Sequence, residues 1–149
     1  PRAVLMAGYK DTSSSDAVYM LDWYAYGIGK VPAKVATTYQ NISDAWSLLI
    51  DQKWHDRITA IKVSDGGLSY VEFFEYRKNK MSIPLFNIYC ATGSNREYYA
   101  ERTDLIQLGQ TTQAIYFAKL TNEGEQSELA LTGDEIKARF SLVNQAWNN

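Results

Sequence analysis

Few side chains in this sequence of 149 residues are of the types that catalyse reactions. The single cysteine, Cys90, and the single histidine, His55, form the one combination that would give a thiolate nucleophile with an imidazole base. Cys90 lies in an apolar run and His55 in a charged segment, so we expect Cys90 to be a small buried hydrophobic residue. One cysteine and one histidine cannot form a zinc site, and we predict no metal and no cofactor.

Carboxylates are plentiful, because the chain has 17 Asp and Glu residues, but their spacing singles out no pair. A glycosidase with two facing carboxyl groups is therefore compatible with the sequence without being indicated by it. A Gly-x-Ser-x-Gly nucleophile elbow and a Gly-rich phosphate loop are both absent from the sequence. These observations favour a protein that is not an enzyme.

Two groups of side chains are candidates for ligand binding. The first is Trp23, Tyr24 and Tyr26, with Asp22 beside them, because stacked aromatic rings with a polar neighbour suit sugars or peptides. The same residues would equally cover the edge of a hydrophobic core.

The second candidate group is Arg96, Glu97 and Tyr99, which follow the end of a predicted strand, where binding groups are common. A half-solvated helix at a sheet edge is the alternative interpretation of these residues.

The stretch from Ser82 to Tyr99 has the strongest structural pattern. Residues 83–90 form an apolar and aromatic run that predicts a buried strand. Ser94 stands three residues before Glu97, the spacing of a capping box, which predicts a short helix near 95–103.

The rest of the chain predicts a fold of the α+β class, with one antiparallel sheet of about six to eight strands. Further strands are predicted at 17–26, 35–39, 46–50, 57–63, 68–76, 105–108 and 114–120. For 17–26, a helix capped by Asp16 is the alternative interpretation. Asp65-Gly66-Gly67 predicts a tight hairpin turn.

A second capping box, Thr132 with Glu135, begins an apolar spacing through Phe140 and Trp147. This spacing predicts an amphipathic C-terminal helix near 133–147.

The length of the chain indicates one domain over residues 1–149, with a main body at 35–149. Residues 1–34 would add N-terminal strands and a turn, or the end of a preceding region. The net charge of −2, with well-mixed signs, argues against a nucleic-acid partner. No apolar run approaches the ~20 residues of a transmembrane helix.

The sequence resembles a family of uncharacterised lipid-anchored extracytoplasmic proteins of Gram-positive bacteria, over about residues 39–147. The matching segments are Tyr39-Gln-Asn41, Trp46-Ser-Leu-Leu-Ile50, Lys53-Trp54, Arg57-Ile58, the run from Leu85 to Glu97, Ile115-Tyr116, Phe140-Ser-Leu-Val143 and Trp147. Asp51 and Gln52 depart from the pattern, which commonly has a proline there. The resemblance implies a location outside the cytoplasm, with a surface anchor in the full-length protein, and no known activity.

We therefore expect a non-catalytic cell-surface domain that binds a ligand or has a structural role. The partner classes that we consider are a cell-envelope glycan and a protein, the latter through an exposed sheet edge or aromatic face. The alternative is a carboxylate-based hydrolase that acts on cell-envelope glycans.

Overall fold

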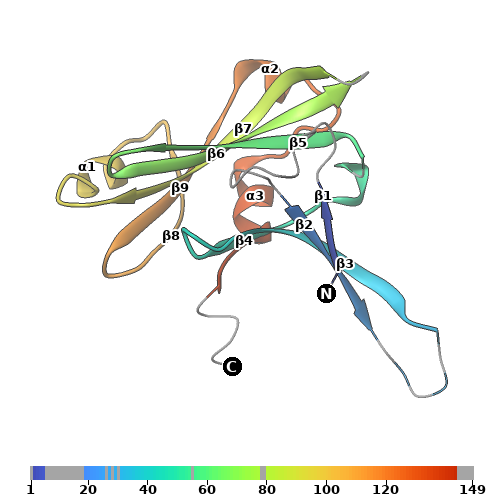
Figure 1. Ribbon diagram of the computed structural model, residues 1–149. Coiled ribbons are helices and arrows are strands. Elements are labelled where there is room, and N and C mark those ends of the chain that lie inside the picture. Colours follow the sequence, from blue (N-terminus) through green and yellow to red (C-terminus); the bar gives the residue numbers. More distant parts are fainter. Residues whose placement is uncertain are drawn as a thin grey trace.

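The computed structural model describes residues 2–5, 19–25, 27, 29, 31–54, 56–77 and 80–143. In this part of the chain, two five-stranded antiparallel sheets pack over a shared core (Figure 1). Sheet A has the order β1-β2-β3-β4-β10 and sheet B has the order β5-β6-β7-β9-β8.

The strands of sheet A are β1 (Arg2–Leu5), β2 (Tyr19–Ala25), β3 (Ala33–Asn41), β4 (Trp46–Leu49) and β10 (Phe140–Leu142). Those of sheet B are β5 (Ile58–Asp65), β6 (Leu68–Arg77), β7 (Lys80–Thr92), β8 (Ile106–Gln110) and β9 (Ala114–Leu120). The helical segments are η1 (Gln52–Trp54), α1 (Glu97–Ala100), α2 (Asn122–Glu125) and α3 (Gly133–Arg139).

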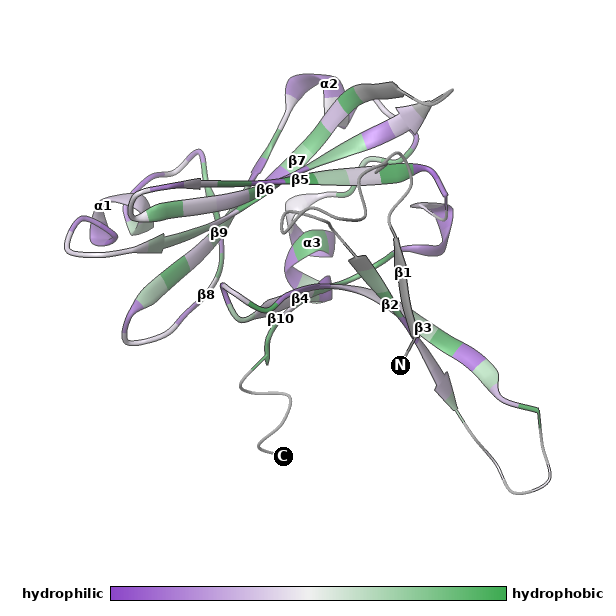
Figure 2. Ribbon diagram, in the orientation of Figure 1, coloured by the Kyte–Doolittle hydropathy of each residue, from purple (hydrophilic) through white to green (hydrophobic). Residues whose placement is uncertain are grey.

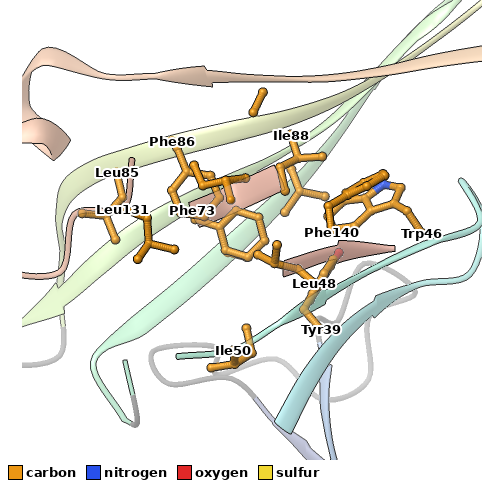
Figure 3. Close-up of a cluster of buried hydrophobic side chains, with 14 of the residues drawn as sticks. Tyr39, Trp46, Leu48, Ile50, Phe73, Leu85, Phe86, Ile88, Leu131 and Phe140 are labelled. Atoms are coloured by element: carbon orange, nitrogen blue, oxygen red, sulfur yellow. The ribbon is translucent and has the colours of Figure 1, made fainter. Parts of the chain in front are cut away.

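Large apolar side chains from both sheets meet in the core (Figure 3). Tyr39 of β3 contacts Phe73 of β6 edge to face, with ring centroids 5.5 Å apart. Helix α3 contacts β4 of one sheet and β8 and β9 of the other, and its Ile136 is fully buried. Both faces of β9 are covered, because Ile115 and Phe117 belong to a second cluster on the outer side of sheet B. Figure 2 shows the hydropathy of the residues along the strands of both sheets.

The antiparallel, mostly β character predicted from the sequence is confirmed, and so are the strands from β2 to β9 within the described residues. Asp65 pairs with Leu68 across the predicted two-residue turn, where Gly66 has φ +59°. A left-handed backbone of this kind favours glycine. The prediction of a single sheet of six to eight strands is wrong, because the strands divide between two sheets.

The C-terminal helix begins where the sequence predicts, but it ends at Arg139, so the predicted extension to residue 147 is wrong. The Thr132 hydroxyl accepts from the Glu135 amide, and the Glu135 carboxylate accepts from the Thr132 amide, as the capping box requires. Phe140 then takes an extended conformation and residues 140–142 pair with β4. This pairing satisfies the open edge of β4 and still buries Phe140. Residues 144–149, with Trp147, lie outside the described residues.

The predicted capping box at Ser94 is also wrong. Helix α1 is a single turn with Arg96 at its N-cap, and no side chain caps it. Four amides between Arg96 and Arg102 bond to carbonyls three residues back, as is common where a helix begins and ends.

One further helical turn, α2, lies in a polar segment for which no helix was predicted. The Thr121 hydroxyl caps it by accepting from the Gly124 amide at 2.9 Å. Pro84 lies at an irregularity of β7, where the register with β6 skips Leu85, a position at which a missing N–H is tolerated.

Candidate functional site

The two candidate groups from the sequence lie on different sheets. Trp23 and Tyr24 belong to β2 of sheet A, whereas Glu97 and Tyr99 belong to α1 at one end of sheet B (Figure 1). Tyr26 lies outside the described residues. The structure therefore does not bring the two groups together into one site.

Trp23 and Asp22 point to opposite faces of sheet A, because successive residues of a strand alternate. The Trp23 indole donates to the Thr38 hydroxyl at 2.9 Å on the outer face. Asp22 instead shares the inner face with Met20 and Tyr39, two residues of the core. The aromatic platform with a polar neighbour that the sequence suggested is therefore divided between two surfaces.

The second group supports local structure. The Arg96 guanidinium donates to the carbonyls of Gly93, at 2.6 Å, and Thr112, at 3.2 Å. The Tyr99 ring stacks on Phe117 with centroids 5.2 Å apart. Glu97 is exposed. Arg96 and Tyr99 thus hold the α1 segment against sheet B, as in the alternative interpretation of a helix at a sheet edge.

A cleft of about 790 Å³ lies beside the inner face of sheet A, where β2 and β3 meet η1 and α3. Its charged lining residues are Asp22, Lys34, Asp51, Asp56 and Arg139. Its apolar lining residues include Met20, Val35, Leu49 and Ile50. A concave surface of this size with a few convergent polar groups is typical of ligand sites.

The floor of the cleft continues the inner face of sheet A beyond the core. Asp22 pairs with Thr37 in the β2–β3 register, and the Ile50 amide donates to the Thr37 carbonyl at 2.8 Å. The Thr37 hydroxyl donates to Asp22 at 2.7 Å, and the Lys34 ammonium lies 3.0 Å from the same carboxylate oxygen. Asp22 is only 8% exposed, so these partners offset the cost of burying its charge.

A second ion pair forms the wall of the cleft. The Arg139 guanidinium at the end of α3 donates to the Asp51 carboxylate at 2.6 Å, and the Lys53 amide donates to its other oxygen at 3.0 Å. Asp56 stands nearby with φ +56°, a left-handed backbone that few residues other than glycine adopt. Such conformations are concentrated at functional sites.

The cleft therefore presents fixed carboxylates, fixed cations and apolar side chains together. Of these residues, only Asp22 belonged to a candidate binding group suggested by the sequence. Asp51 and Arg139 are 88 positions apart along the chain, so no local spacing could have revealed their pairing.

Cys90 is 4% exposed, and burial raises the pKa of its thiol to about 11. The thiol is therefore protonated at neutral pH and is not activated as a nucleophile. His55 lies outside the described residues. Among the described residues, no group of three or more His, Cys, Asp or Glu side chains could hold a metal ion.

No helix in the described part of the chain is long and apolar enough to cross a membrane. Comparisons with protein-family models, with curated proteins and with solved structures found no match to this chain.

Proposed function

We propose that this chain is a non-catalytic domain on the outer side of a bacterial cell, and that it binds a cell-envelope glycan or peptide in the cleft beside sheet A. The ion pairing of the cleft carboxylates is the observation that supports this proposal. Asp22 and Asp51 each contact a cation of the protein itself, at 3.0 Å and 2.6 Å.

Ion pairing of this kind suits recognition better than hydrolysis. A glycosidase needs one carboxyl group that keeps a proton for the leaving oxygen, in an environment that disfavours its charge. Asp22 and Asp51 instead lie against Lys34 and Arg139, at 3.0 Å and 2.6 Å, and these contacts fix the two carboxylates as hydrogen-bond acceptors. Fixed donors, fixed acceptors and apolar side chains such as Met20 can together contact a ligand with hydroxyl, amide and charged groups.

Isothermal titration calorimetry with soluble glycan and peptide fragments of bacterial cell wall tests the proposal. We expect binding that weakens about tenfold or more in the double variant Asp51→Asn, Arg139→Gln, because the ligand loses charged partners. The matched control is Arg102→Asn with Asp104→Asn, which removes an exposed ion pair beside α1 and should leave the affinity unchanged. The proposal would be refuted if the two double variants lowered the affinity equally, or if the parent chain bound no fragment.

The alternative function, a hydrolase of cell-envelope glycans, predicts a different result. Glycan fragments would then be shortened during incubation, and Asp22→Asn or Asp51→Asn would abolish that cleavage. Chromatography of the fragments after incubation separates the two functions.

The proposed location has its own test. Protease added to intact cells that express the full-length gene should degrade the protein if it is outside the cytoplasm. Full protection in intact cells, with degradation after lysis, would contradict an extracytoplasmic location.

A further inference from the structure

The two ion pairs of the cleft differ in how firmly their cations are held. Pairing of β1 with β2 stops at Asp22, and pairing of β3 with β4 stops at Thr38. Lys34 therefore lies on the part of the β2–β3 hairpin where the described strands pair only with each other, and which extends away from both sheets (Figure 1). Its side chain is 38% exposed, and its ammonium group sits on a flexible four-carbon stem. The Arg139 side chain, at the end of α3, is 24% exposed. The Lys34 ammonium can thus leave the cleft without breaking any strand pairing.

Asp22 stays in place when the Lys34 ammonium leaves. Its side chain is 11% exposed on the inner face of sheet A, and Asp22 pairs with Thr37 in the β2–β3 register. The Thr37 hydroxyl donates to the same carboxylate oxygen that the Lys34 ammonium contacts, at 2.7 Å and 3.0 Å. A carboxylate buried to this degree is stabilised by a cation beside it. The position of the Lys34 ammonium therefore suits any ammonium group, whichever molecule carries it.

The other described lining residues favour a positive ligand group on an apolar stem. Without the Lys34 ammonium, the charged side chains of the described lining are three carboxylates and one guanidinium, those of Asp22, Asp51, Asp56 and Arg139. This excess of negative charge attracts a cation. Met20 and Ile50 also line the cleft, and the stem of an alkyl amine can pack on such side chains.

Anionic and uncharged ligands fit this position less well. A ligand carboxylate or phosphate bound to Lys34 would lie close to Asp22, which is itself 3.0 Å from the Lys34 ammonium. Like charges at such short range disfavour binding. A neutral glycan would displace Lys34 without giving Asp22 a cation in return, whereas an alkyl amine replaces one ammonium group with another.

We propose that the cleft binds a peptide through the ammonium group of an alkyl amine, such as a lysine side chain, and that Lys34 occupies the place of this group on Asp22 until the ligand displaces it. Lys34 is then an internal competitor of the ligand. The inference rests on the proposed function, because it concerns the same cleft, and it selects the peptide over the glycan.

Isothermal titration calorimetry with two peptides tests this inference. The first is acetyl-Ala-Lys-Ala-amide, and the second is the same peptide with its lysine acetylated at Nζ, which keeps the stem and removes the charge. We expect the parent chain to bind the lysine peptide about tenfold or more tightly than the acetylated peptide, because only the former can pair with Asp22. This comparison uses the parent chain alone, so it does not depend on the folding of a variant.

Lys34→Ala tests the competition. Its affinity for the lysine peptide should rise about fivefold or more, because the cleft is no longer occupied by the ammonium group of the protein itself. A lysine with only a structural role would give no gain on removal. Lys119→Ala is the matched control, since Lys119 is exposed on β9 of sheet B and does not line the cleft, and it should leave the affinity unchanged. Circular dichroism of both variants checks that the fold is intact.

Titration with the soluble glycan fragments of cell wall separates this inference from the proposed function. Binding of glycan fragments, with no preference for the lysine peptide over the acetylated peptide, would overturn the inference and leave the proposed function in place. No binding of glycan or peptide would overturn both. An equal or lower affinity for the lysine peptide in Lys34→Ala would also overturn the inference, because Lys34 would then not compete with the ligand.

Discussion

The phenolic hydroxyl of Tyr116 donates a hydrogen bond to the main-chain carbonyl of Asp44, 2.6 Å away. Tyr116 belongs to β9 of sheet B, and Asp44 lies in the turn between β3 and β4 of sheet A. This bond therefore ties the two sheets together beside the core. Val143 strengthens the same region, because its amide donates to the Ala45 carbonyl at 2.9 Å.

Tyr116→Phe should lower the free energy of unfolding by about 1–2 kcal/mol, because the Asp44 carbonyl loses its donor at a partly buried site. The corresponding decrease in Tm is about 2–8 °C for a domain of this size. Tyr89→Phe is the control, since its hydroxyl accepts from Asn87 on the half-buried outer face of sheet B and should cost less. Thermal unfolding followed by circular dichroism measures both, and equal Tm values for Tyr116→Phe and the parent chain would contradict the expected role of the bond.

Ala45→Gly should stabilise the protein. Ala45 has φ +62°, a left-handed conformation that costs a residue with a Cβ about 1–2 kcal/mol. Glycine avoids this cost but adds freedom to the unfolded chain, so we expect a net gain of about 0.5–1 kcal/mol. Ala36→Gly, the same exchange in extended β3, should destabilise instead. Urea unfolding gives both values, and two changes of the same sign would refute the argument.

Gly124→Ala should be strongly destabilising. A Cβ at Gly124 would lie 2.2 Å from the Leu85 carbonyl oxygen, so α2 would have to move away from β7. We expect a loss of about 2–3 kcal/mol. Gly133→Ala is the comparison, because its Cβ would meet only the flexible end of Ile106, at 2.6 Å, and a change below about 1 kcal/mol is expected. If chemical denaturation showed equal losses for both variants, the close packing of α2 on β7 would not be the cause.

Stability should fall at alkaline pH in part through Cys90. Burial raises the pKa of this thiol from about 9 to about 11, so the folded protein keeps a proton that the unfolded chain releases. The contribution is fully present below pH 9 and is lost as the pH rises from 9 to 11, by up to about 1.4 kcal/mol per pH unit.

Urea unfolding at pH 8, 9 and 10 measures this dependence. In Cys90→Ala the free energy of unfolding should fall less between pH 9 and 10 than in the parent chain. Parallel curves for the two proteins would show that the thiol does not contribute. Tyr39 and Tyr116, whose pKa values burial also raises, should add to the loss in both proteins at higher pH.

Local patterns in the sequence predicted local structure well. The two residues of the Thr132–Glu135 capping box are three positions apart, and the Gly66-Gly67 turn joins strands that pair directly. These features depend on neighbours along the chain, so a single sequence contains the information that they require.

The periodic spacing around Phe140 shows where a local pattern fails. A helix would place Ile136 and Phe140 on one face, as the sequence suggested, yet Phe140 and Leu142 also alternate in the way that a strand requires. The open edge of β4 decides between the two, because its backbone groups need partners. That edge is set by residues almost a hundred positions earlier in the chain.

The sequence by itself determined the strands from β2 to β9, the tight hairpin, the start of α3 and the burial of Cys90, because these follow from side-chain alternation and short-range hydrogen bonds. Only the tertiary structure decided that the strands form two sheets, that Trp23 and Asp22 face opposite surfaces, and that Asp22, Lys34, Asp51 and Arg139 line one cleft. The physical reason is that these features depend on contacts between distant segments. Many pairings of such segments agree with the same local pattern, and the packing of the whole core selects one of them.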